Sequence, residues 1–222
     1  MQRLTYILHP ASFLRWKMSS LDLFGKISSF VETHLTESGK EQIARPMGPR
    51  FVFEHSLRVA FWCWRLALIQ HADVSISVAA GLLHDVSHFE PEVLSVDIAR
   101  NFMKSEKFNR EFMDSVVCAI ESRTDRGKAK TMETKILEDA NKMDEFGYLR
   151  LLQFTKSLSD TFSQLEMESN SLLREVEKLE KGEYGETWTS MAKVRLQAQI
   201  GLYNDFLKGL LEEIENTRTT MG

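Results

Sequence analysis

The sequence predicts an all-α protein. Along most of the chain, apolar residues recur every three or four positions, which is the spacing of one helix face, and no stretch shows the apolar and polar alternation of a strand between hairpin turns. The chain has 222 residues, 43% of them hydrophobic, enough for one substantial packed domain. We therefore expect a single helical bundle.

The first helix is expected to begin near Ser20 and to end at Gly39, a typical C-cap residue. The segment before it lacks the continuous apolar core and cleavage site of a secretory signal. We interpret residues 1–17 as a disordered extension and 18–222 as one domain. The irregular stretch ARPMGPR, rich in proline, then leads to a helix expected over 51–72.

The segment 73–88, DVSISVAAGLLHDVSH, is expected to form a helix buried on several sides. Asp73 is its predicted N-cap, and Pro91 limits its end because proline disfavours helix in the residue before it. Similar periodicity predicts further helices over 93–104, 109–123 and 131–147.

Apolar residues from Leu158 to Leu179 follow a heptad spacing that Ser169 interrupts. One interpretation is a long helix folded against the final helix, expected over 188–215. The other is a coiled coil that joins two copies of the chain, so a homodimer through the 158–179 helix is possible.

Composition excludes several classes of protein. The formal net charge of -4 gives no broad attraction for nucleic acid, which argues against a nucleic-acid-coating role. Cys63 and Cys118 lie in apolar stretches and predict buried thiols in a reducing compartment. The most apolar segment is interrupted by Arg65 and is shorter than the roughly 20 residues that cross a bilayer. We expect a cytoplasmic protein without a membrane-spanning helix.

Polar residues with metal-binding chemistry interrupt two of the apolar helices. His84 and Asp85 follow the apolar stretch AAGLL, and His55 lies one helix earlier in FEHSLRVA. A lone histidine in such a helix is more often a hydrogen-bonded core residue than a ligand. Packing of the two helices would, however, bring both imidazoles to one point.

A third helix, ILEDANKMDEFG over 136–147, carries acidic residues among apolar ones. Charge runs usually mark a solvated face, but buried carboxylates need a cation or several hydrogen-bond donors. Two imidazoles with carboxylate or carboxamide oxygens suit manganese, iron, cobalt, nickel or zinc. Such an ion generates a water-derived nucleophile at neutral pH, and hydrolysis of a phosphate ester is its natural use.

The order of His55, then His84 and Asp85, then DANKMD resembles the H…HD…D signature of the HD-domain metal-dependent phosphohydrolases. The flanking stretches look most like the small stand-alone bacterial and archaeal HD hydrolases. The resemblance implies an HD-type bundle with its core at about 50–150 and a long C-terminal helical hairpin at about 150–216. It also implies that these three residues are metal ligands, with Asp85 part of the catalytic group.

The fourth ligand departs from this resemblance, since relatives usually carry aspartate where this chain has Asn141. An asparagine oxygen can still bind a divalent ion, but it carries no charge, so affinity should fall. Asp139 is the alternative ligand, although two positions along a helix correspond to a rotation of about 200°. No histidine lies in VVCAIESRTD, where a second metal site would draw ligands, so we expect one divalent transition-metal ion.

Three further residues are candidates for the chemistry. His88 resembles the position where nucleotide-cleaving HD enzymes keep a histidine, and it could move protons; the alternative is a solvent-facing residue. Lys142 and Arg58 could hold a substrate phosphate, with Lys142 also placed in the catalytic group. The alternative for Arg58 is an ion pair with Asp144 inside the bundle.

Taken together, these residues predict a metal-dependent phosphohydrolase that acts on a nucleotide or another small phosphate ester. The alternative is a catalytically degenerate HD module that binds a nucleotide or a protein partner. Asn141 is the main support for that alternative.

Overall fold

The computed structural model describes residues 10–42, 48–90, 94–124, 131–157 and 161–221. Within these ranges the regular structure is helical and no strand occurs, which confirms the all-α prediction. The elements are α1 (Pro10–Ser38), η1 (Lys40–Gln42), α2 (Pro49–Gln70), α3 (Val74–Leu83), α4 (Ser95–Ser105), α5 (Arg110–Thr124), α6 (Met132–Glu145), α7 (Tyr148–Ser157), α8 (Phe162–Glu180) and α9 (Ser190–Met221).

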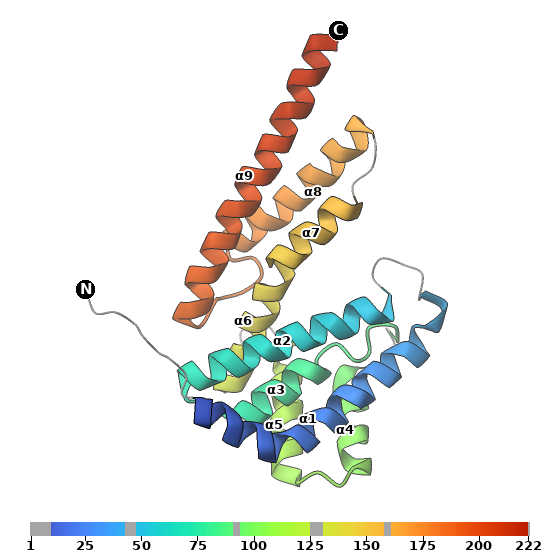
Figure 1. The fold of residues 1–222 in the computed structure, drawn as a ribbon, viewed down its shortest axis with the longest axis vertical. Coiled ribbons are helices and arrows are strands. Elements are labelled where there is room, and N and C mark those ends of the chain that lie inside the picture. The colour runs from blue at the N-terminus through green and yellow to red at the C-terminus, as the bar shows by residue number, and fades with distance from the viewer. Residues whose placement is uncertain (1–9, 43–47, 91–93, 125–130, 158–160, 222) are drawn as a thin grey trace, which may run out of the picture.

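Helix α3 is the centre of the bundle. It contacts α1, α2, α4, α5 and α6, and every residue from Ser77 to Leu83 is buried. Its polar start is stabilised by Asp73, whose Oδ1 accepts a hydrogen bond from the Ile76 amide at 2.9 Å, as the sequence predicted. Figure 1 shows α3 between α1 and α2, both of which it contacts.

Gly81 allows α2 and α3 to pack with their backbones in contact. A Cβ atom at this position would lie 2.8 Å from the Ala60 Cα atom and 3.1 Å from the Cys63 sulfur. No side chain larger than hydrogen therefore fits between the two helices. This close approach holds the end of α3 beside the middle of α2, where His55 lies.

Helix α6 connects the bundle to the C-terminal helices. Its buried face packs on α2, α3, α5 and α9, and Thr131 caps its start by accepting a hydrogen bond from the Thr134 amide. At its end, Tyr203 of α9 donates a hydrogen bond to the Gly147 carbonyl at 3.1 Å. Figure 1 shows α8 and α9 extending away from the bundle beyond α6.

Part of the heptad pattern of α8 is buried within the same chain. Val176, Leu179 and the interrupting Ser169 are all buried in the described structure, and α8 packs along α9. The long helix folded against the final helix is therefore the arrangement seen here. The homodimer through 158–179 stays a prediction, and Leu158, its first heptad position, lies outside the described residues.

Several helix boundaries differ from those predicted. Helix α1 begins at Pro10 rather than near Ser20, so it includes the second half of the predicted extension; residues 1–9 lie outside the described ranges. Helix α3 ends at Leu83, and residues 84–89 form turns closed by short hydrogen bonds such as His88 N to Asp85 O at 3.1 Å. Helix α7 was not predicted as a separate element. In the described part of the chain, no helix is long and apolar enough to cross a membrane.

Candidate metal centre

His84 lies where α3 ends, and its backbone fixes which ring nitrogen faces the site. The side chain is buried, and Nδ1 lies 2.9 Å from the Gly81 carbonyl oxygen. Because a carbonyl oxygen can only accept, Nδ1 carries the proton and donates it to this bond. When the ring is neutral, Nε2 presents its lone pair, the arrangement that a metal-binding histidine requires.

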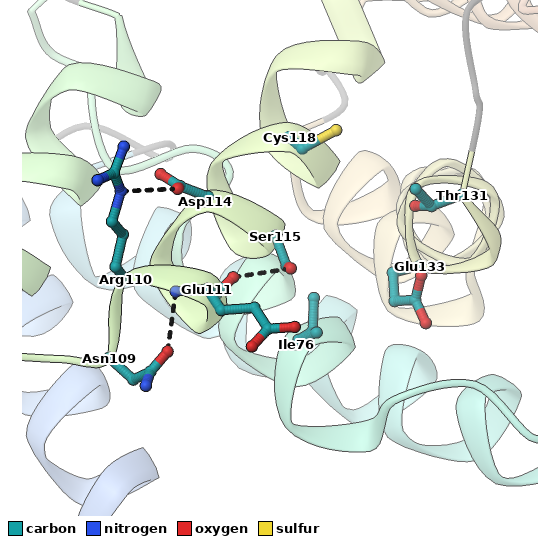
Figure 2. Close-up of a pocket in the computed structure, with 9 residues that line it drawn as sticks. All are labelled: Ile76, Asn109, Arg110, Glu111, Asp114, Ser115, Cys118, Thr131 and Glu133. Atoms are coloured by element: carbon teal, nitrogen blue, oxygen red, sulfur yellow. Dashed lines mark hydrogen bonds and ion pairs between the residues drawn. The ribbon is translucent and has the colours of Figure 1, made fainter.

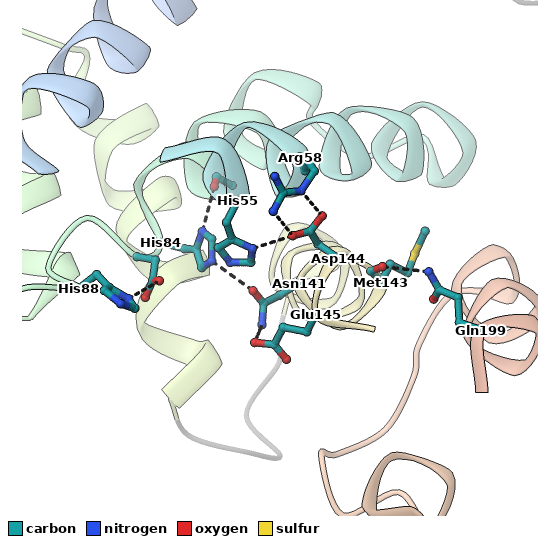
Figure 3. Close-up of polar contacts among 11 residues, drawn as sticks. His55, Arg58, His84, His88, Asn141, Met143, Asp144, Glu145 and Gln199 are labelled. Carbon is teal, nitrogen blue, oxygen red and sulfur yellow. Dashed lines mark hydrogen bonds and ion pairs between the residues drawn. The ribbon is translucent and has the colours of Figure 1, made fainter. Parts of the chain in front are cut away.

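His55 on α2 is oriented by Asp144 of α6. Its Nδ1 donates a hydrogen bond to Asp144 Oδ2 at 2.7 Å. Arg58, one turn further along α2, donates to both carboxylate oxygens, from Nε at 2.7 Å and from Nη2 at 3.1 Å. Figure 3 shows the two α2 side chains converging on this carboxylate.

The environment of Asp144 keeps the group ionised. Burial by itself raises the pKa of this carboxyl, but hydrogen bonds from His55 and Arg58, together with the charge of Arg58, lower the pKa below its usual value. An ionised Asp144 holds the proton of His55 on Nδ1, so the Nε2 lone pair of His55 also faces the site.

His55, His84 and Asp85 converge into one group. One potential ligand atom from each lies within 4.8 Å of the others, and the two imidazole ring centres are 5.2 Å apart. Ligand atoms on opposite sides of one ion lie roughly 4 Å apart, so the ligand atoms of this group would need to move only slightly closer to hold an ion. The packing of α3 on α2, combined with the turn that follows α3, brings the three residues together.

Asn141 of α6 faces the same group. Its Oδ1 lies 3.2 Å from His84 Nε2, and its Nδ2 donates a hydrogen bond to Glu145 Oε1 at 2.7 Å. The oxygen and the ring nitrogen are both acceptors when His84 is neutral, so a proton on Nε2 or a metal ion between the two atoms would stabilise their contact. Two atoms held about 2.1 Å from one ion are roughly 3.0 to 3.4 Å apart, which fits the contact.

The match to a known family covers this group of residues. Residues 52–146 match the model of the HD domain. The chain contains an HD domain. HD domains depend on metal ions, and the described residues hold the expected His, His and Asp group.

Solved structures show the same fold over most of the chain. A predicted HD superfamily hydrolase from an uncultured Thermotogales bacterium aligns with a TM-score of 0.57, covering 83% of this chain and 91% of that chain. The two sequences are 17% identical, so this similarity concerns the fold. No curated protein matches the chain.

Asp139 of the HD domain contacts the segment before α9, and its role as the alternative ligand stays a prediction. Its carboxylate accepts hydrogen bonds from the backbone amides of Trp188 at 3.0 Å and Thr189 at 2.7 Å, at the start of α9. Burial raises the pKa of Asp139, and these hydrogen bonds offset part of that effect. The rotation of about 200° between positions 139 and 141 places the two side chains on different faces of α6.

Lys142 is also turned away from the metal-binding group. Its ammonium donates hydrogen bonds to the carbonyl oxygens of Gly185 at 3.2 Å and Glu186 at 2.7 Å. The structure therefore places this buried lysine in the link between the HD domain and the C-terminal helices. Its role as a catalytic and substrate-binding residue stays a prediction.

His88 lies beside the metal-binding group, at its solvent side. Its Nδ1 is 3.1 Å from Asp85 Oδ2, and about a third of each side chain is exposed, 33% and 31%. The hydrogen bond with Asp85 raises the pKa of His88, burial opposes the change, and the charge of Asp85 adds to it.

A cleft of about 360 Å³ opens directly onto these residues. One side of it carries His55, Arg58, Asp85 and His88, and the other side comes from α6, α7, α8 and the segment after α8. The second group, which motif reasoning missed, consists of Phe146, Arg150, Leu172, Glu175 and Tyr184. No sequence signal marks them, because their only common property is the side of the cleft they line.

A second hollow, of about 700 Å³, lies between α3, α5 and the start of α6 (Figure 2). Its polar side chains are engaged in holding helix ends. Asn109 accepts a hydrogen bond from the Glu111 amide at 2.8 Å, and Glu133 accepts one from the Asp73 amide at 3.0 Å. These groups explain the hollow as a junction of helix caps rather than a site for chemistry.

Proposed function

We propose that this protein is a metal-dependent phosphohydrolase that cleaves a nucleotide or another small phosphate ester. One observation carries the proposal: potential ligand atoms of His55, His84 and Asp85 lie within 4.8 Å of one another, and His55 and Asp85 line an open cleft. A purely structural role would not need both rings held in the metal-binding tautomer beside a cavity of substrate size.

In the proposed site, His55, His84, Asp85 and Asn141 hold one divalent transition-metal ion. The mixed nitrogen and oxygen donors favour manganese, iron, cobalt, nickel or zinc. When bound, such an ion polarises a phosphoryl oxygen and activates water as the nucleophile. His88, hydrogen-bonded to Asp85 at the rim, is the proposed proton donor to the leaving oxygen.

The cleft also supports an anionic substrate with an apolar part. The charge of Arg58 is engaged by Asp144, whereas Arg150 of α7 has no ion pair within the described ranges and lines the same cleft. We therefore assign Arg150 to the substrate phosphate. The rings of Phe51, Phe146 and Tyr184 supply apolar surface for a base or sugar.

The direct test is metal content followed by hydrolysis. Protein purified without chelator or nickel resin should carry about one transition ion per chain by mass spectrometry, and the His84→Ala variant should carry almost none. The loaded protein should then release phosphate or a nucleoside from a panel of nucleotides. Failure to take up an ion after addition of manganese or cobalt would exclude the proposed function.

A non-catalytic HD module remains the second candidate because Asn141 lacks the charge of an aspartate. Protein that binds the ion and a nucleotide without cleaving it would favour this candidate. A large gain of turnover in Asn141→Asp would support the same conclusion. A loss of existing turnover would instead show that asparagine is used. We also propose that the protein is cytoplasmic.

A further inference from the structure

We propose that Glu145 is the positioning residue that makes Asn141 usable as a metal ligand. In this proposal, its carboxylate turns the amide oxygen of Asn141 towards His84 and returns the negative charge that asparagine lacks. The inference rests on the metal site of the proposed function and adds to it a residue that the HD signature does not contain.

The Asn141 amide can turn either its oxygen or its NH₂ group towards His84. His84 Nε2 offers a lone pair, because the Gly81 carbonyl holds the ring proton on Nδ1. Left to itself, the amide would turn its NH₂ group towards that lone pair and form an ordinary hydrogen bond. Asn141 and His84 would then satisfy each other, and neither would present a lone pair to an ion.

Glu145 favours the opposite orientation. Its Oε1 accepts a hydrogen bond from Asn141 Nδ2 at 2.7 Å, and such a bond to an ionised acceptor is about twice as strong as a neutral one. A turned amide would place its oxygen against this carboxylate, where two acceptors repel. The amide oxygen therefore stays 3.2 Å from His84 Nε2. Figure 3 shows Glu145 and Asn141 one turn apart on the face of α6 that is turned to the histidines.

Glu145 also changes the net charge around the proposed metal ion. An ion held by two neutral imidazoles, Asp85 and a neutral amide keeps one positive charge more than it would with aspartate at position 141. Glu145 supplies one negative charge through the amide, next to the ligand atom rather than on it. The site thus has the same net charge as one with aspartate at position 141, but the carboxylate lies one helical turn further along α6, at position 145.

Glu145 is the last residue of α6. The negative end of the helix dipole lies there, so an acidic residue does not stabilise the helix at this position. Among the described residues, Glu145 has no ion pair, and it lines the metal cleft. A contribution to folding therefore does not explain a carboxylate here, whereas orientation of the ligand does.

The test is a double-mutant cycle read by calorimetric titration with Mn²⁺ alone on the full chain. The variants are Glu145→Gln, Asn141→Asp and the double variant. Glu145→Gln should weaken Mn²⁺ binding by about tenfold or more in the wild-type background. In the Asn141→Asp background the same change should leave affinity within about twofold or strengthen it, because the amide is gone and two carboxylates one turn apart repel.

The matched control is Glu175→Gln, which removes a negative charge from the same cleft. Glu175 pairs with Lys178 and Tyr184 rather than with Asn141, so this variant should bind Mn²⁺ within about twofold of wild type. Thermal unfolding of each variant verifies that it is folded. Glutamine at the exposed position 145 keeps the size of the side chain.

Three results would overturn the inference: an unchanged affinity in Glu145→Gln, an equal loss in both backgrounds, or a wild-type protein that takes up no Mn²⁺. An unchanged affinity leaves the proposed phosphohydrolase standing. Conversely, consider the outcome in which Glu145→Gln weakens Mn²⁺ binding in wild type but not in Asn141→Asp, while the protein cleaves no phosphate ester. That result overturns the proposed function and leaves the role of Glu145 intact.

Discussion

At the scale of the residue, Asp144 illustrates how one buried carboxylate sets the chemistry of a neighbouring ring. It accepts the Nδ1 proton of His55 and is itself held by the guanidinium of Arg58. The pair of donors compensates for the burial of the charge and fixes the carboxylate in place. The orientation of His55, a proposed ligand, therefore depends on Asp144, which is not in the proposed ligand set.

Replacement of Asp144 by asparagine tests this dependence. The neutral amide cannot satisfy both donors as the carboxylate does, so we expect metal affinity to fall by about ten- to a hundredfold. The free energy of unfolding should fall by about 2 kcal/mol. Titration calorimetry and urea denaturation measure the two effects. Asp114→Asn, at an exposed ion pair with Arg110, is the control and should change neither quantity. Unaltered metal binding in Asp144→Asn would contradict the orienting role.

Arg150 provides a second prediction at this scale. If its guanidinium holds the substrate phosphate, Arg150→Ala removes a charged hydrogen bond, and KM should rise by about tenfold or more. Metal content should not change, since Arg150 is not in the metal-binding group. Steady-state kinetics and metal analysis test both parts, with Arg110→Ala as a control on the other hollow. A KM equal to that of wild type would remove Arg150 from the substrate site.

At the scale of the element, the contact of α2 with α3 brings the histidines together. The two helices can approach this closely because position 81 has no side chain to separate them. The sulfur of Cys63 fills the same contact, and burial raises the pKa of this thiol far above its usual range. The contact is therefore apolar, tightly packed and intolerant of added volume.

Gly81→Ala should force α2 and α3 apart. The added Cβ would lie 2.8 Å from the Ala60 backbone, so we expect a loss of about 2 kcal/mol in unfolding free energy and weaker metal binding. Gly201→Ala is the matched control: it lies in α9 with nothing within 4 Å of the new atom. This control should gain about 0.5 to 1 kcal/mol, because alanine favours helix over glycine. Equal effects of the two substitutions would refute the packing argument.

At the scale of the whole molecule, α6 serves two partners at once. One face carries Asn141 and Asp144 to the histidines of the HD domain. The other uses Asp139 and Lys142 to hold the segment between α8 and α9. Because that segment begins near the Tyr184 wall of the cleft, the same helix positions both the proposed ligand Asn141 and one wall of the cleft.

Asp139→Ala separates these two roles. Loss of the acceptor leaves the amides of Trp188 and Thr189 without their partner, and unfolding free energy should fall by about 2 to 4 kcal/mol. Hydrogen exchange should rise at the start of α9, whereas metal affinity should stay within about twofold. Asp205→Ala, exposed on α9, is the control. A large loss of metal affinity with stability unchanged would return Asp139 to the ligand set.

Local features of the sequence were sufficient for the helices and for the core of the site. The 3.6-residue periodicity is a property of each segment by itself, and residues 52–146, which include His55, His84 and Asp85, match the HD domain model. The end of the central helix was less predictable. Turns replace the helix from residue 84 onward, although the apolar pattern before it is that of a continuing helix.

The sequence by itself determined the fold class, the HD domain and the grouping of His55, His84 and Asp85. Only the tertiary structure decided which polar residues of α6 face that group. Asn141 faces His84, whereas Asp139 and Lys142 bind the start of the C-terminal helices. The physical reason is that a helix fixes the angle between its own side chains, but only packing against α2, α3 and α9 determines what each face meets.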